Sequence, residues 1–194
     1  MNARLAACAA ALLASGCATL PPPGDGDWPV RRGALQALDD WTLTGRVAVA
    51  AGEQGFSGGL RWRQAGARAE IDMRGPFGGT ALAIRLDGEA ITVTDASGAT
   101  LGGEEARRIA RDYVGAPLPL PELRYWLVGA PAPDSEFRET LGANARLAAL
   151  EQAGWQVRYT RYAAAGGQVL PDRIELTAGD VRLRLAVSDW RFTP

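Results

Sequence analysis

Apolar and polar residues alternate along much of this chain, which is the pattern of strands with one buried and one exposed face. In residues 68–74, apolar side chains at every second position alternate with charged ones, and residues 82–86 repeat the pattern. We predict that these two segments form a hairpin. The same alternation predicts further strands near residues 42–50, 56–64, 91–93, 155–162, 173–177 and 181–188.

The hydrophobic period changes to that of a helix in three places. Residues 104–114 carry an apolar stripe and open with two acidic residues, which the positive end of a helix favours. Residues 122–128 are predicted to form a second helix and residues 30–40 a third. Residues 141–152 are ambiguous, because their alanines favour a helix whereas the turn that follows favours a hairpin; we predict a strand from about residue 145.

Strands that follow one another through short turns predict an antiparallel sheet. The two helices between the strand groups predict a lid laid across that sheet. A chain of 194 residues is long enough for one core. We therefore predict a single domain over residues 28–194.

The N-terminal segment has the pattern of an export signal. One basic residue, Arg4, precedes an apolar run over residues 5–14, which is about half of the ~20 residues that span a bilayer. Small residues then precede Cys17, as in a bacterial lipobox. We predict removal of residues 1–16, lipidation of Cys17 and a Pro- and Gly-rich tether over residues 17–27. The alternative is ordinary secretion with Cys17 as a free thiol.

Charge and composition exclude several classes of function. Loss of Arg4 would leave 20 of the 21 basic residues against 22 acidic ones, and this balance argues against a nucleic-acid binder. The chain has no histidine, so the commonest general base near neutral pH is absent. The aspartates lie mostly at turns and on polar strand faces, which predicts solvating roles. We expect no catalytic residue, no metal and no cofactor.

Residues 55–59 match the G-x-S-x-G pattern of a serine hydrolase nucleophile. That pattern needs a helix after the serine and a histidine to take its proton. Here a strand follows, and histidine is missing. We predict that Ser57 is an outward-facing strand residue among glycines that permit a bend.

The loop at residues 75–79 holds one large apolar residue, Phe77, among glycines and a proline. The simplest interpretation is that Phe77 folds back onto the edge of the sheet as core. The other is contact with a membrane or a partner.

Several motifs together resemble the LolB family of outer-membrane lipoprotein receptors. Besides the lipobox, they are Trp41-Thr-Leu-Thr-Gly-Arg-Val47, the segment 55–62, the loop 75–79, the segment 118–129, Gly154-Trp-Gln-Val157 and the segment 183–190. The resemblance implies a mainly β fold with a few helices: an incomplete, open antiparallel β-barrel with helices packed on the open side and an apolar cavity within.

The resemblance also implies a function. Members of the family accept acylated lipoproteins from the periplasmic chaperone LolA and place them in the outer membrane without an energy source. It further implies a lipid-anchored protein at the periplasmic leaflet, which we expect to be a monomer. A protruding loop with an apolar tip, here Pro76, Phe77 and Gly78, would contact the membrane.

The apolar faces of the predicted strands and helices supply candidates for an acyl-chain cavity. These are Leu60, Trp62, Ile71, Met73, Leu82, Ile84, Ile109, Tyr113, Leu123, Trp126, Leu183 and Leu185. The alternatives from other classes are an assembly lipoprotein that binds a protein partner through its open sheet, and a lipocalin-like carrier of a small apolar molecule.

Overall fold

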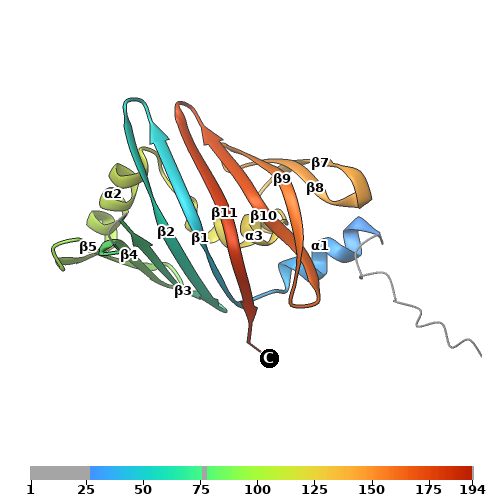
Figure 1. Ribbon diagram of the computed structural model, residues 1–194, viewed down its shortest axis with the longest axis horizontal. Helices are drawn as coiled ribbons and strands as arrows, with labels where there is room; N and C mark the ends of the chain where they lie inside the picture. The colour runs from blue at the N-terminus through green and yellow to red at the C-terminus, as the bar shows by residue number, and fades with distance from the viewer. Residues whose placement is uncertain (1–26, 76–77, 194) are drawn as a thin grey trace, which may run out of the picture.

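The protein is built around one antiparallel sheet of eleven strands, seen in Figure 1. The computed structural model describes residues 27–75 and 78–193. The strands are β1 (Asp40–Ala51), β2 (Gln54–Ala65), β3 (Arg68–Arg74), β4 (Thr80–Asp87), β5 (Ala90–Asp95), β6 (Thr100–Gly102), β7 (Phe137–Leu141), β8 (Leu147–Gln152), β9 (Trp155–Ala165), β10 (Gln168–Ala178) and β11 (Val181–Phe192). The helices are α1 (Trp28–Gln36), α2 (Gly103–Val114) and α3 (Leu120–Val128), with a 3₁₀ turn at Ala143–Ala145.

The sheet does not close on itself. Its order is β6-β5-β4-β3-β2-β1-β11-β10-β9-β8-β7, so that β6 and β7 each have one neighbour among the described strands. Helix α2 packs on β5 and β6, and α3 packs on β10 and on α1. Figure 1 shows α2 and α1 at opposite ends of the sheet. The predicted open antiparallel fold with helices against it is confirmed.

The burial of side chains follows the alternation in the sequence. In β3 and β11 the apolar positions face the helices and the charged positions face solvent. The core includes Trp41, Leu43 and Val93, each no more than 1% exposed. Helix α2 is capped by Gly115, whose φ of 87° lies in the left-handed region and whose N–H donates to the Arg111 carbonyl at 2.7 Å.

Three local predictions needed correction. Helix α1 spans Trp28–Gln36 and stops before β1 begins at Asp40, whereas we predicted a helix over residues 30–40. The strand predicted from about residue 145 is present as β8 but begins at Leu147, because Asn144 and Ala145 have positive φ angles in the preceding turn. Strands β6 and β7 were not predicted.

The predictions for residues 1–27 and for the loop at residues 75–79 lie partly outside the described residues. The signal segment 1–16, Cys17, most of the tether 17–27, Pro76 and Phe77 fall outside the described residues. The base of the loop is described: the Gly75 and Gly78 N–H groups donate to the carbonyls of Gly79 and Gly75, each at 3.0 Å.

The G-x-S-x-G segment lies inside β2, and its glycines permit close packing. A Cβ on Gly58 would lie 1.9 Å from the Arg74 carbonyl oxygen, whereas a Cβ on Gly59 would meet nothing closer than 3.8 Å. We expect Gly58→Ala to lower the free energy of unfolding by about 2 kcal/mol, because β2 and β3 must separate locally. Urea denaturation measures this loss. Gly59→Ala is the matched control, with an expected loss below about 0.5 kcal/mol; equal losses would contradict the steric explanation.

Candidate functional site: an apolar interior under helix α3

The concave side of the sheet forms an apolar pocket together with α2 and α3. Strands β1 to β4, β10 and β11 contribute inward side chains, and the helices and the segment before α3 contribute the rest. Every lining residue is apolar: Val47, Val49, Leu60, Trp62, Ile71, Met73, Ile84, Val114, Leu118, Leu120, Leu123, Leu127, Leu176, Leu183 and Leu185. Such a surface can bind hydrocarbon, and it offers no group for acid–base or nucleophilic chemistry.

The structure brings most of the predicted cavity residues together. Eight of the twelve candidates line this pocket: Leu60, Trp62, Ile71, Met73, Ile84, Leu123, Leu183 and Leu185. The other four lie elsewhere in the core or at its margin. Leu82 is a buried residue of β4, and Ile109 is half-buried on α2. The ring centroids of Tyr113 and Phe56 are 5.2 Å apart, and Trp126 faces β8.

Our sequence analysis missed seven lining residues: Val47, Val49, Val114, Leu118, Leu120, Leu127 and Leu176. The two valines share the inward face of β1 with the core residue Leu43, so the alternation contained the signal. Leu118 and Leu120 lie in a proline-rich connection, where no period marks a buried face.

The free volume of the pocket is about 70 Å³. This is far less than an acyl chain of a dozen or more carbons needs, since one water molecule alone takes about 30 Å³ of liquid. The structure thus has the apolar lining but does not show the expected cavity. Leu120, Leu123 and Leu127 of α3 occupy the concave side of the sheet.

A second hollow, of about 480 Å³, adjoins the pocket and shares Leu118 and Leu120 with it. Arg124 of α3 lines this second hollow and is hydrogen-bonded to the β2–β3 turn, since its Nη1 donates to the Gly66 carbonyl at 2.8 Å. The Gln64 Nε2 donates to the same carbonyl at 2.8 Å, and the Trp62 Nε1 donates to the Gln64 Oε1 at 2.9 Å. A short hydrogen-bonded chain therefore connects the pocket wall to the helix that covers it.

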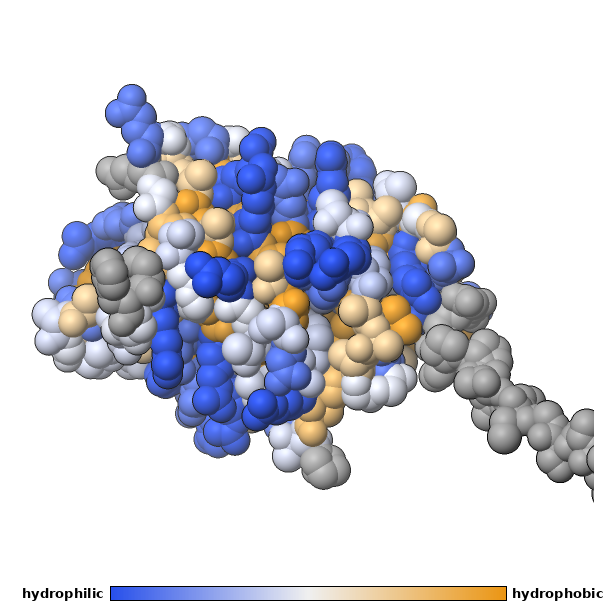
Figure 2. All heavy atoms as spheres, viewed as in Figure 1, coloured by the Kyte–Doolittle hydropathy of each residue, from blue (hydrophilic) through white to orange (hydrophobic). Residues whose placement is uncertain are grey.

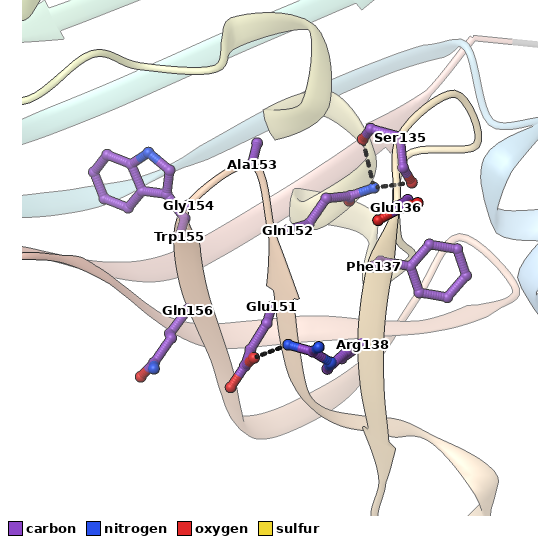
Figure 3. Close-up of a pocket in the computed structure, with 10 residues that line it drawn as sticks. All are labelled: Ser135, Glu136, Phe137, Arg138, Glu151, Gln152, Ala153, Gly154, Trp155 and Gln156. Atoms are coloured by element: carbon purple, nitrogen blue, oxygen red, sulfur yellow. Dashed lines mark hydrogen bonds and ion pairs between the residues drawn. The ribbon is translucent and has the colours of Figure 1, made fainter.

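The opposite side of α3 is held by Gln152, the last residue of β8. Its Oε1 accepts from the Trp126 Nε1 and the Ala132 N–H, both at 2.8 Å. Its Nε2 donates to the Ala132 carbonyl at 2.9 Å and to Ser135, where Figure 3 shows the two bonds. Gln152 is 3% exposed, and all of these partners lie on α3 or in the segment after it. It therefore fixes this side of the helix to the sheet.

The hollow drawn in Figure 3 has a volume of about 620 Å³ and differs in chemistry from the interior. Polar and charged residues of β7 and the segment before it, of β8 and of β9 line most of it, and the rings of Phe137 and Trp155 point to opposite sides. It is therefore unsuited to bind a hydrocarbon chain.

Beneath α3, the Tyr159 hydroxyl donates to the Trp126 carbonyl at 2.9 Å. Burial raises the pKa of this hydroxyl well above its ordinary value, so it stays protonated as a donor. Within residues 27–75 and 78–193, no three His, Cys, Asp or Glu side chains gather closely enough to hold a metal ion. No helix in these ranges is both long and apolar enough to cross a membrane.

Comparison with known proteins gives consistent results. The family model described as "Outer membrane lipoprotein LolB" matches residues 39–190. A relative from Pseudomonas aeruginosa, named outer-membrane lipoprotein LolB, is 38% identical, over 96% of this chain and 94% of its own length. A relative of the same name from Stutzerimonas stutzeri is 36% identical over the same shares.

Solved structures with little sequence identity share the fold. A DUF1329 family protein from Desulfovibrio piger has a TM-score of 0.60 at 9% identity, over 86% of this chain and 90% of its own. A LolA superfamily protein from Nitrosomonas europaea has a TM-score of 0.52 at 14% identity, over 84% of this chain and 94% of its own.

Proposed function

Because the chain belongs to the LolB family, and is thus an outer-membrane lipoprotein with a role in lipoprotein localization, we propose that it accepts acylated lipoproteins from the periplasmic chaperone LolA and inserts them into the outer membrane. The observation that carries this proposal is the wholly apolar lining beneath α3. No catalytic step belongs to the proposal, and transfer requires no cofactor.

The energetics of the cargo fit such a surface. Each CH₂ of an acyl chain that returns to water loses about 0.8 kcal/mol of favourable burial, so the chain must pass from one apolar surface to another. In our proposal α3 moves away from the sheet and the acyl chain replaces its leucines against Val47, Ile71 and Leu185. One set of apolar contacts replaces another, which removes the need for an energy source.

The same proposal places the protein at its site of action. The lipid on Cys17 anchors the chain in the periplasmic leaflet, and residues 17–27 form the tether to the folded domain. The loop of Pro76, Phe77 and Gly78 contacts the bilayer. The protein acts as a monomer, because one pocket and one loop suffice for the transfer.

Transfer of a labelled lipoprotein from purified LolA to this protein tests the proposal directly. We expect the label to move to this protein in the absence of nucleotide, and mass spectrometry of the product to find the acylated cargo bound. A stoichiometric, unacylated protein partner would instead support an assembly role. A bound small hydrophobe would support a carrier.

The half-buried Leu183 offers a test of the pocket itself, because it lines the pocket without being central to the core. We expect Leu183→Asn to reduce acceptance of the lipoprotein about fivefold, since a polar amide in a hydrocarbon site costs about 1 kcal/mol or more. The matched control is Ala50→Asn, which places the same side chain on the exposed outer face of β1. Equal acceptance by both variants would remove the pocket from the proposal.

A further inference from the structure

The outer face of the sheet carries a row of arginines that the transfer function does not use. The register of the strands aligns Arg74 of β3 with Gly59, Gly59 with Arg46 of β1, Arg46 with Ala186, and Ala186 with Arg173 of β10. Neighbouring strands lie about 4.8 Å apart, so successive arginines of this row are separated by about 10 Å. Gly59 and Ala186 place no long side chain between them. Arg173 is half-buried, and its Nη1 donates to the Asp172 carbonyl at 2.8 Å. We call Arg74, Arg46 and Arg173 the arginine row.

The row borders a hollow of about 440 Å³ on this outer face. Arg46, Arg173 and Arg184 stand around it, and small residues, among them Ala48 and Ala186, lie between them. Guanidinium groups around a shallow floor form a site of the kind that binds phosphate, because each planar fork can donate two parallel hydrogen bonds to phosphate oxygens.

The acidic residues of this face do not neutralise the row. Glu175, the acid in the hollow, is bound by the Arg182 Nε at 3.2 Å and by the Arg184 Nε at 3.3 Å. Asp72 on β3 is bound by the Arg85 Nη2 at 3.0 Å. Among the described residues, the Arg46 side chain makes no hydrogen bond and no ion pair.

Across the central strands the basic residues outnumber the acidic ones. The outer positions of β1, β2, β9, β10 and β11 hold Arg46, Arg61, Arg63, Arg158, Arg173, Arg182 and Arg184. Against these stand Glu175, Asp40 at the start of β1, and two pairs that are neutral in themselves, Arg191 with Asp189 and Arg161 with Asp172. Figure 2 shows hydrophilic side chains gathered over the central strands in the same view as Figure 1. A chain with a net charge of −1 has therefore concentrated positive charge on one face.

The first arginine of the row lies directly before the loop at residues 75–79. Arg74 is the last residue of β3, and Gly75 directly after it forms the hydrogen-bonded base of the loop with Gly79. Any surface that the loop contacts therefore lies next to the first arginine of the row. If that surface is a bilayer, Arg74 lies beside the phosphates of its headgroups, and the rest of the row leads away from this point across the outer face.

We propose that the arginine row and its hollow bind the phosphate groups of anionic phospholipids, and thereby orient the sheet against the membrane. The inference relies on the proposed function only for the membrane contact of the loop. The lipid anchor limits how far the protein can move from the membrane, whereas the row sets which face the protein presents to it.

Vesicle binding tests the proposal in a chain that carries Cys17→Ala, so that no lipid anchor contributes. The probes are vesicles of phosphatidylcholine with and without phosphatidylglycerol, and the readout is co-sedimentation. The test variant is Arg46→Gln with Arg173→Gln. The control is Arg108→Gln with Arg111→Gln, which removes the same charge from the exposed side of α2.

We expect the chain with an intact row to bind the anionic vesicles and to bind neutral ones much more weakly. The row variant should bind the anionic vesicles about 30-fold more weakly, equivalent to about 1 kcal/mol for each arginine removed. The control should change little, and high salt should release the intact chain. Equal binding to both vesicle types, no binding at all, or an equal loss in the control would each overturn the proposal.

Acceptance of a lipoprotein from LolA should be unchanged in the row variant. Failure of the intact chain to accept cargo would count against the proposed function and would leave the vesicle result standing. The two proposals are therefore tested separately.

Discussion

Replacement of Phe77 by Glu is expected to block insertion of lipoproteins into the membrane while leaving their acceptance from LolA intact. Burial of one Phe side chain contributes about 1.5–3 kcal/mol, and its loss alone slows a step that needs this burial by at least about tenfold. A carboxylate adds the cost of placing a charge in hydrocarbon. The measurement is the amount of labelled lipoprotein that reaches vesicles after it has been loaded onto the receptor.

Phe77→Leu is the control, since leucine is also large and apolar and should sustain insertion. The design also decides between the two interpretations of this residue in the sequence. If Phe77 packed on the edge of the sheet as core, Phe77→Glu would lower stability and acceptance together. Normal insertion by the Glu variant would remove the loop from the mechanism.

The second large effect is expected at Gln152. Gln152→Leu keeps the approximate volume but leaves the Trp126 Nε1, the Ala132 N–H and the Ala132 carbonyl without their present partners. Each unpaired buried polar group costs about 1–3 kcal/mol, and we expect a loss of about 3 kcal/mol or more in the free energy of unfolding. Urea denaturation followed by tryptophan fluorescence measures it.

Gln156→Leu is the matched control for this change. Gln156 lies on the neighbouring strand β9 and is exposed, so the same substitution there should change stability by less than about 0.5 kcal/mol. A similar loss in both variants would show that the effect comes from glutamine replacement in general and not from the bonds that hold α3.

Strands with faces of different polarity could be predicted from the sequence. In β3 and β11 every second side chain enters the core, and a local pattern of this kind needs no knowledge of distant residues. Strand β7 was missed because Glu139 is turned to the inner side. It accepts from the Trp28 Nε1 at 2.8 Å and from the Arg32 Nη1 at 3.2 Å, and these partners lie more than 100 positions away. Strand β6 has only three residues, too few to show a period.

The site was predictable to the extent that strands define it. Inward strand residues such as Leu60 and Ile71 do line the pocket, because the sheet has a single concave side. Helix residues were less predictable, since a helix with apolar residues on several sides can turn any of them to the pocket. In α3, Leu127 lines the pocket, whereas Trp126 turns to Gln152 and β8.

The separation of β6 from β7 has a mechanical consequence. A closed barrel has a fixed circumference, because its strand number and stagger are locked by a complete ring of hydrogen bonds. Here the two margins can move apart through a change in twist, with every ladder kept intact. In the proposed function, this freedom would let one sheet accommodate cargoes that differ in the number and length of their fatty chains.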